Sequence, residues 1–296
     1  MKKSYKQIMN EVYQANNEKT ISGDQVNLLR KTLLLSYKNI FDKCDENDIR
    51  PILCGGSALG AVRHGGFIPW DDDFDIAMSR RDFEKFKQIF KKELSDKYIL
   101  EAPNYSDIVK TRMPKIYIKN AFVHYCGSEE GEHLSIDLFI IENIPNNKLI
   151  RSGRGFLAMA LMYIIGQVQS YENQSEYLKK YWSKTIEGEK VYKKRVKKGK
   201  IFSFLDAKQW ICLLDRVCHY DKESEYVSIP TGRKHYFGEI MKKDVFFPPI
   251  ETLFDECRAY IPNKVDDYLK NLYGDYMVVP KNEDREKHYI KSIDIR

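Results

Sequence analysis

The sequence predicts an α/β protein of the α+β type, in which helices flank a mixed β-sheet. Short apolar runs that end on glycines or contain a single acid, such as residues 51–54 and 135–141, are typical of buried strands. Longer segments with apolar residues at helical spacing lie between these runs and dominate from about residue 149. The length of 296 residues, with 43% hydrophobic and 31% charged residues, is that of a soluble globular protein with one large domain or two unequal ones.

The elements of the first half alternate between helix and strand. Ser22 with Gln25, and Ser79 with Asp82, fit capping boxes at the starts of two helices. The expected elements, in order, are a helix over 24–46, a strand over 51–54, a helical turn over 58–63, a strand over 73–78, a helix over about 79–94, and strands over 115–118, 121–125 and 135–141.

The second half predicts helices first and a smaller mixed region at the end. The expected elements are helices over 149–170, 175–185 and 206–220, strands over 226–229 and 245–247, and a last helix over 263–273. This order predicts four parts, namely an N-terminal extension (1–23), a core (24–145), a mainly helical insertion (146–225) and a C-terminal region that packs on the core (226–296).

The longest apolar run, FLAMALMYIIG, covers residues 156–166. A helix needs about 20 residues to span a bilayer, so we expect that this run does not cross a membrane alone. A buried helix is the favoured interpretation, and an interfacial membrane contact is the alternative.

Residues 190–200 contain seven basic residues in eleven. A solvated linker or helix face explains such a run as well as a clamp for an anionic acceptor or an anionic membrane leaflet does. The sequence leaves these interpretations open.

Charge and cysteine usage indicate an intracellular protein. The formal net charge of +6 suits an anionic partner without singling out nucleic acid. The six cysteines show no Cys-x-x-Cys spacing, which argues for reduced thiols and against a zinc site or disulfides. Because the basic N-terminus lacks the apolar core of a signal peptide, we expect a cytoplasmic location.

Four carboxylates stand within five residues, at Asp71, Asp72, Asp73 and Asp75. In a strand over 73–78, Asp73 and Asp75 would point to the same side, while the residues between and after them pack into the core. Two parallel carboxylates repel each other unless a cation lies between them, and Mg²⁺ is commonly held by such carboxylates together with substrate phosphates. The cluster therefore predicts metal-dependent chemistry on a phosphate.

Asp137 lies inside a nearly continuous apolar strand. An unpaired charge there would cost several kcal/mol, so we expect a partner for it. The partner is either a nearby Lys or Arg or a metal ion shared with Asp73 and Asp75, and we favour the metal.

Gly55, Gly56 and Ser57 follow the first predicted strand. Glycine lets a ligand approach the main chain closely, so this turn could offer N–H groups and a hydroxyl to phosphate oxygens. A glycine–serine turn, paired strand acids and a third strand acid, in that order, match the arrangement of nucleotidyltransferases.

The segment 56–76, GSALGAVRHGGFIPWDDDFDI, resembles the signature of the LicD family of phosphotransferases, which is related to fukutin and the fukutin-related protein. The C-terminal part agrees with this resemblance. Its matching segments are YFG at 236–238, VFFPP at 245–249, YLKNLYGDY at 268–276, Pro280 and His288. The resemblance implies a nucleotidyltransferase-like mixed sheet as the catalytic core.

The resemblance also implies an activity. Family members move a phospho-alcohol, phosphocholine in the best-known ones, from a CDP-activated donor such as CDP-choline to a sugar hydroxyl and release CMP. The acceptor would be a glycan or lipid-linked precursor of teichoic acid, lipopolysaccharide or capsule. Asp73, Asp75 and Asp137 would hold Mg²⁺ (or Mn²⁺), and Asp137 would also accept the proton of the attacking hydroxyl.

Other residues are candidates for substrate contacts, and each has a structural alternative. Arg63 and His64 could donate to the diphosphate or only fix the loop, and Trp70 could stack on cytosine or fill the core. Lys115 could contact phosphate or lie at the surface. The full set of candidates for binding substrate or phosphate is Gly55, Gly56, Ser57, Arg63, His64, Trp70, Asp72, Lys115 and His288. Asp71 and Asp72 are expected to support the ligands rather than bind the metal themselves.

Two other functions remain open on the sequence alone. A nucleotidyltransferase would share the acids and release pyrophosphate, and a non-catalytic module would bind an anionic polymer through residues 190–200. We expect no nucleic acid and no obligate protein partner. Peripheral contact with the inner face of the cell membrane is compatible with the cytoplasmic location.

Overall fold

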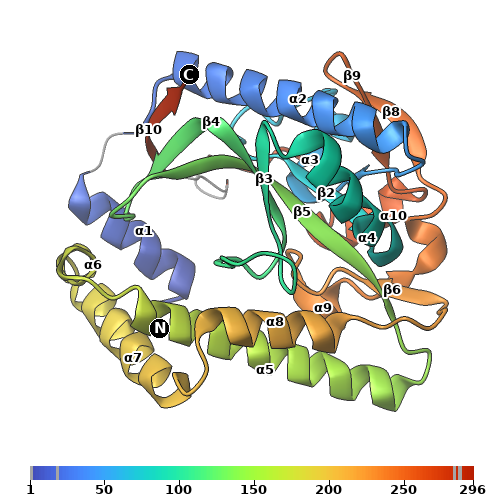
Figure 1. The fold of residues 1–296 in the computed structure, drawn as a ribbon. Coiled ribbons are helices and arrows are strands. Elements are labelled where there is room, and N and C mark those ends of the chain that lie inside the picture. Colours follow the sequence, from blue (N-terminus) through green and yellow to red (C-terminus); the bar gives the residue numbers. More distant parts are fainter. Residues whose placement is uncertain (1–2, 18–19, 283–284, 286–288) are drawn as a thin grey trace.

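A mixed sheet of ten strands organises the chain, and helices cover it on both sides (Figure 1). The structure is a computed structural model and describes residues 3–17, 20–282, 285 and 289–296. The helices are α1 (Tyr5–Asn16), α2 (Gly23–Asp45), α3 (Gly55–His64), α4 (Arg80–Ile89), α5 (Lys148–Glu172), α6 (Glu176–Trp182), α7 (Ile186–Phe202), α8 (Ala207–Cys218), α9 (His235–Gly238) and α10 (Val265–Tyr273). The predicted α+β class is confirmed.

The strands follow the order β10-β4-β5-β2-β1-β9-β8, while β3 pairs with β4, and β6 joins β5 to β7. Their bounds are β1 (Ile52–Leu53), β2 (Asp75–Ser79), β3 (Tyr98–Glu101), β4 (Lys115–Tyr125), β5 (Glu132–Ile144), β6 (Tyr226–Ser228), β7 (Met241–Lys242), β8 (Ile250–Phe254), β9 (Cys257–Ile261) and β10 (Ile290–Ile295). The pairing of β2 with β5 is parallel and sets Asp75 directly opposite Asp137. Two acids far apart in sequence therefore become neighbours.

Helix starts agree with the expected caps. Ser22 and Gln25 form the reciprocal capping box of α2. The Ser79 hydroxyl accepts the Asp82 N–H at 3.1 Å and begins α4. The local sequence was sufficient to predict these two helix starts, because the hydrogen bonds of a cap join residues only three positions apart.

Several expected boundaries are wrong. The helical turn expected over 58–63 is part of α3, which already begins at the paired glycines. The second strand begins at Asp75, so Asp73 lies in the extended segment before it. The strands expected over 115–118 and 121–125 are one strand, β4, with a register shift opposite β5. The strand expected over 245–247 is a 3₁₀ turn that begins at Lys243.

Some elements were not expected at all. The N-terminal extension contains α1, the basic run lies within α7, and β3, β10 and the β8–β9 hairpin complete the sheet. Edge strands such as β10 carry weak patterns of their own because they bury few side chains.

The main core lies between the sheet and helices α2, α3, α4 and α10. Its centre is aromatic: the ring centroid of Phe74 lies 4.6 Å from that of Tyr37 and 5.0 Å from that of Phe254. Phe74 thereby anchors the segment that carries the acids, because its ring is fully buried between Asp73 and Asp75.

A second apolar cluster lies below the sheet in Figure 1, where α5 packs against α8. It includes Ala158 and Ile165 from α5 and Trp210, Ile211 and Leu214 from α8. The apolar run 156–166 is therefore buried only in part, because Ala158 and Ile165 face this cluster whereas Phe156, Leu157 and Tyr163 are exposed.

Helix α5 is longer than the apolar run from which no membrane crossing was expected. The helix is 25 residues long, and an 18-residue window has a mean hydropathy of 1.3, so by length and composition it could cross a membrane. Only 28% of that window is buried. The apolar run alone is too short to span a bilayer, but the helix extends beyond it at both ends.

A buried ion cluster connects the sheet to the helical layer. Arg80 of α4 donates to the carboxylate of Glu142, which is 1% exposed, and to Asp215 of α8 at 2.6 Å. Burial raises the pKa of Glu142, and the Arg80 charge opposes that rise. A buried carboxylate of this kind is stable only while its cation remains beside it.

We expect Arg80→Ala to lower the free energy of unfolding by about 3–5 kcal/mol, because it leaves Glu142 buried and unpaired. Urea denaturation of the purified variant measures this loss. Replacing Arg80 and Glu142 together by methionine should cost much less, since the buried carboxylate of Glu142 is removed together with its cation. Equal losses in the single and double variants would contradict this account.

Candidate active site

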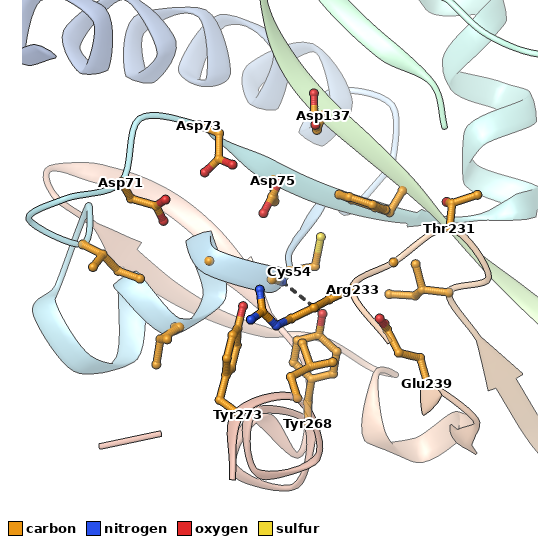
Figure 2. A pocket seen from close by; sticks show the side chains of 18 of the residues that line it. Cys54, Asp71, Asp73, Asp75, Asp137, Thr231, Arg233, Glu239, Tyr268 and Tyr273 are labelled. Atoms are coloured by element: carbon orange, nitrogen blue, oxygen red, sulfur yellow. Dashed lines mark hydrogen bonds between the residues drawn. The ribbon is translucent and has the colours of Figure 1, made fainter. Parts of the chain in front are cut away.

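A cavity of about 660 Å³ opens where the β1–α3 turn, the start of β2 and the middle of β5 meet. One wall carries Asp71, Asp73, Asp75 and Asp137 (Figure 2). The facing wall carries Arg233, Tyr268, Tyr273 and Glu239 from the C-terminal region. The cavity is therefore acidic on one side and contains basic and aromatic groups on the other.

The acids reach the cavity from three places in the chain. Asp75 begins β2, Asp137 is its register partner on β5, and Asp71 and Asp73 lie in the segment before β2. Arg30 of α2 fixes this segment, since its guanidinium donates to the carbonyl of Asp71 at 2.6 Å and to that of Ile68 at 3.1 Å. No sequence pattern pointed to this arginine, because its partners are backbone atoms about forty residues away.

The paired glycines make room for carboxylates. A Cβ at Gly55 would lie 2.7 Å from Oδ2 of Asp75, and one at Gly56 would lie 2.6 Å from Oδ2 of Asp71. Gly55 also has a φ of +51°, which side-chain-bearing residues rarely adopt. Any larger residue at either position would displace an acid from the cavity.

The backbone groups of this turn already have partners. The Gly55 N–H donates to the Tyr268 hydroxyl at 3.0 Å, and the Gly56 N–H bonds to the Asp75 carboxylate. The buried Ser57 hydroxyl accepts the Asp75 N–H at 2.8 Å and does not line the cavity. In this structure the turn positions Asp75 rather than presenting donors to a phosphate, which differs from the expectation for Ser57.

Asp137 has an ion-pair partner. Lys115 Nζ lies 2.9 Å from its Oδ1, and the two side chains are 17% and 18% exposed. They face each other across the β4–β5 ladder. Burial works to lower the pKa of Lys115, but Asp137, Glu132 and Asp75 outweigh it and the pKa is raised. The structure thus shows the lysine alternative for Asp137, and the expected surface position of Lys115 is wrong.

The surroundings of Asp75 disfavour the charged form of its carboxyl group. Burial raises its pKa well above the ordinary range, and the charges of Asp73, Asp137 and Asp71 raise it further, against the Gly56 N–H. Several carboxylates that repel each other in one buried place are stabilised by a cation.

The residues fit a divalent metal by chemistry. Among the residues that the structure describes, no group of three or more His, Cys, Asp or Glu side chains converges closely enough to hold an ion. Hard cations such as Mg²⁺ nevertheless require only one or two carboxylates together with substrate phosphates and water. Asp73 and Asp75 line the same cavity and meet that requirement.

The remaining candidates divide into two groups. Arg63 and Trp70 line the cavity, but Arg63 donates to the Tyr276 carbonyl at 2.6 Å and its guanidinium carbon lies 5.9 Å from the centroid of the Trp70 ring. The guanidinium carbon of Arg285 lies 4.0 Å from the same centroid, so Trp70 packs between two arginines. His64 and Asp72 do not line the cavity. His288 lies outside the described residues.

The facing wall was missed by sequence reasoning. The guanidinium carbon of Arg233 lies 5.0 Å from the centroid of the Tyr273 ring, and Figure 2 shows its side chain pointing into the cavity toward the acids. Glu239 is 1% exposed, and burial raises its pKa to about 7. The segment around 231–239 carried a signal, since polar and charged residues surround the family-like YFG at 236–238.

Comparison with known proteins agrees with this geometry. Residues 48–153 match the profile described as the LicD/FKTN/FKRP nucleotidyltransferase domain. The chain is 26% identical over 255 residues to the lipopolysaccharide cholinephosphotransferase LicD of Haemophilus influenzae, an alignment that covers 84% of this chain and 89% of that protein.

Two uncharacterized rickettsial proteins share a shorter region. The protein from Rickettsia prowazekii is 32% identical over 115 residues, which is 36% of this chain and 43% of that protein. The one from Rickettsia typhi is 34% identical over 115 residues, or 36% of this chain and 37% of that protein. Residues 48–153 of this chain thus match a nucleotidyltransferase domain described for LicD, FKTN and FKRP, in agreement with the resemblance in residues 56–76.

Proposed function

We propose that the protein is a metal-dependent phosphotransferase. It moves a phospho-alcohol, phosphocholine in the first instance, from a CDP-activated donor to a sugar hydroxyl of a cell-surface glycan precursor and releases CMP. The observation that carries this proposal is the parallel register that sets Asp75 beside Asp137 in a cavity shared with Asp73. The cholinephosphotransferase activity named for the Haemophilus relative supports the choice of phosphocholine and of a lipopolysaccharide-like acceptor.

In this proposal Asp73 and Asp75 hold Mg²⁺ or Mn²⁺. When bound, the cation neutralises charge that develops on the transferring phosphoryl group. The acids fit this role because their mutual repulsion in a buried site is relieved by a cation. Asp137 completes the site when its carboxylate turns from Lys115.

The remaining groups orient the two substrates. Asp137 is the proposed proton acceptor for the attacking sugar hydroxyl. Arg233 faces the acids and can bind phosphate oxygens, a geometry for which guanidinium is suited. Trp70, held between two arginines, forms one edge of the cavity.

A nucleotidyltransferase that releases pyrophosphate remains the second candidate, since it would use the same acids. The two differ in the phosphorus that is attacked. Incubating the protein with CDP-choline, Mg²⁺ and a lipid-linked glycan should yield CMP and a choline-modified glycan. Pyrophosphate formation from CTP, without CMP release from CDP-choline, would favour the second candidate.

We also propose that the enzyme works in the cytoplasm at the inner face of the membrane. The outward side of α5 is apolar between residues 149 and 163, with exposed side chains at Leu149, Ile150, Phe156, Leu157 and Tyr163. These positions recur at helical spacing and form one stripe. Lys198 of α7 lies beside the end of this stripe, where its ammonium is 5.2 Å from the Tyr163 ring centroid. An apolar stripe next to basic residues is typical of a helix that lies on an anionic membrane.

Substituting Asp75 by Asn should lower the rate of transfer by on the order of 10³, because the substitution removes a charged metal ligand. Asp73→Asn should act similarly, and Asp137→Asn should lower kcat. Release of CMP from CDP-choline measures all three. Asp42→Asn, an exposed acid on α2, serves as the matched control and should keep full activity. Unchanged transfer in both Asp73→Asn and Asp75→Asn would disprove the metal assignment.

Removing divalent metal with EDTA should abolish transfer, because the carboxylates alone repel the donor diphosphate. Adding Mg²⁺ or Mn²⁺ in excess should restore the rate, while Na⁺ at equal ionic strength should not. Differential scanning fluorimetry gives a second readout: Mg²⁺ should raise the melting temperature of the wild type but not of Asp75→Asn. Full activity after exhaustive chelation would contradict the proposal.

Changing Phe156 and Leu157 together to Ser should weaken membrane binding, because about half or more of each side chain is exposed on the stripe. Flotation with vesicles that contain anionic phospholipid measures binding. Leu253→Ser removes an apolar side chain that is 60% exposed on β8 and serves as the control. Equal flotation of the wild type and both variants would exclude α5 as the contact.

A further inference from the structure

A buried carboxylate lies behind the turn that carries Arg233. Glu239 directly follows α9, is 1% exposed and lines the cavity together with Arg233 and Tyr273 (Figure 2). Its Oε1 accepts the backbone N–H of Lys234 at 2.9 Å. Within the part of the chain that the structure describes, this carboxylate forms no ion pair. Glu239 therefore meets the turn as a hydrogen-bond acceptor and not as the partner of a cation.

Gly232 leaves the space that this carboxylate occupies. Gly232 is buried, and a Cβ there would lie 2.5 Å from Oε1 and 2.8 Å from Oε2 of Glu239. Since a Cβ does not approach oxygen so closely, only glycine lets the carboxylate pack against the backbone at this point. The carboxylate thus contacts Gly232 on one side of Arg233 and the N–H of Lys234 on the other. It holds the backbone on both sides of the arginine.

Backbone hydrogen bonds close the same turn. The N–H of Gly232 donates to the Ile229 carbonyl at 3.0 Å, and the N–H of His235 donates to the Gly232 carbonyl at 3.0 Å. His235 has a backbone φ of +58°, which is uncommon for a residue with a side chain. Such a conformation persists where the surrounding contacts hold it. The bond from Lys234 to Glu239 is one of these contacts, because Lys234 directly precedes His235.

The turn is also joined to α10. The Lys234 ammonium donates to the Asn271 carbonyl, and the Asn271 side-chain amide donates to the Gly238 carbonyl at 2.8 Å. Tyr273 lies two residues further along α10, and the guanidinium carbon of Arg233 lies 5.0 Å from its ring centroid. Arg233 itself is exposed, so burial does not fix its side chain. Its direction into the cavity depends on the backbone of the turn and on the Tyr273 ring.

We propose that Glu239 is a positioning residue, which holds the turn 232–235 so that Arg233 points into the cavity and binds a phosphate of the nucleotide donor. Glu239 acts through Arg233, because a carboxylate would itself repel phosphate. A long side chain loses conformational freedom when it binds a ligand, and a backbone that is already fixed lowers this cost. The inference rests on the proposed function in one respect, namely that the donor is a nucleotide that bears phosphate.

Calorimetry with CDP and with cytidine, both in Mg²⁺, tests the role in binding. CDP carries both phosphates of the proposed donor and has no alcohol to transfer. Glu239→Ala should weaken CDP about tenfold and leave cytidine unchanged, because only the phosphate contact of Arg233 is lost. Glu239→Gln keeps an acceptor oxygen for the Lys234 N–H and should restore most of the CDP affinity. Glu223→Ala, whose side chain is 87% exposed outside the cavity, is the matched control. Equal CDP affinity in Glu239→Ala and the wild type would overturn the proposal.

A double-mutant cycle shows whether Glu239 acts through Arg233. Arg233→Gln should also weaken CDP about tenfold, because it removes a charge-assisted hydrogen bond to phosphate. Adding Glu239→Ala to Arg233→Gln should cause no further loss, whereas losses that multiply would show that the two residues act independently and would overturn the positioning role. Gly232→Ala should resemble Glu239→Ala, since its Cβ displaces the carboxylate. It provides the same comparison if Glu239→Ala does not fold.

Amide hydrogen exchange measures the hold on the turn without any ligand. Because Glu239 accepts the Lys234 N–H, exchange in residues 231–238 should be faster in Glu239→Ala than in the wild type and unchanged in Glu223→Ala. Equal exchange in Glu239→Ala and the wild type would contradict the inference. If the wild type binds no CDP, the nucleotide donor of the proposed function is rejected, whereas the exchange result still decides whether Glu239 holds the turn.

Discussion

The parallel pairing of β2 with β5 is the constraint on which the rest of the structure depends. It places Asp75 opposite Asp137 and so concentrates negative charge where the start of β2 meets the middle of β5. This charge is tolerated because Lys115 stands across the ladder from Asp137 and because the cavity admits ligands. The surrounding parts hold this pairing in place: the Phe74 ring buries the segment between the acids, and Arg30 fixes the loop before them. A fold built around such a pair is adapted to cation chemistry.

The cavity has two unlike walls because it is closed by segments from opposite ends of the chain. The acids come from the first half, whereas Arg233, His235 and Glu239 come from a short stretch after the helical insertion. On each wall, burial raises the pKa of one carboxyl group, Asp75 on the acidic wall and Glu239 on the facing wall. The acidic wall suits a cation and the basic wall suits phosphate, which are the two components of phosphoryl transfer.

Local sequence signals predicted the fold class, the capping of α2 and α4, and the strand that carries Asp137, because these features depend on residues close in sequence. They did not show which groups adjoin the paired glycines, whose role as phosphate donors stays a prediction. The structure shows instead that Gly55 and Gly56 leave space for carboxylates of Asp75 and Asp71. The failure has a clear physical cause, since a glycine pattern shows that something approaches the backbone closely but does not show what approaches.

The sequence by itself determined that this chain carries paired acids in an apolar setting and the signature of a phosphotransferase family, since both depend on residue type and spacing alone. Only the tertiary structure decided which groups face each other. Lys115 was expected at the surface and proves to be the partner of Asp137, while Arg233 and Glu239 line the cavity opposite acids that lie about a hundred residues or more away in sequence. Such pairs are set by strand register and loop packing between distant segments. Hydrogen bonds and charges act through space, and no local pattern in the chain encodes them.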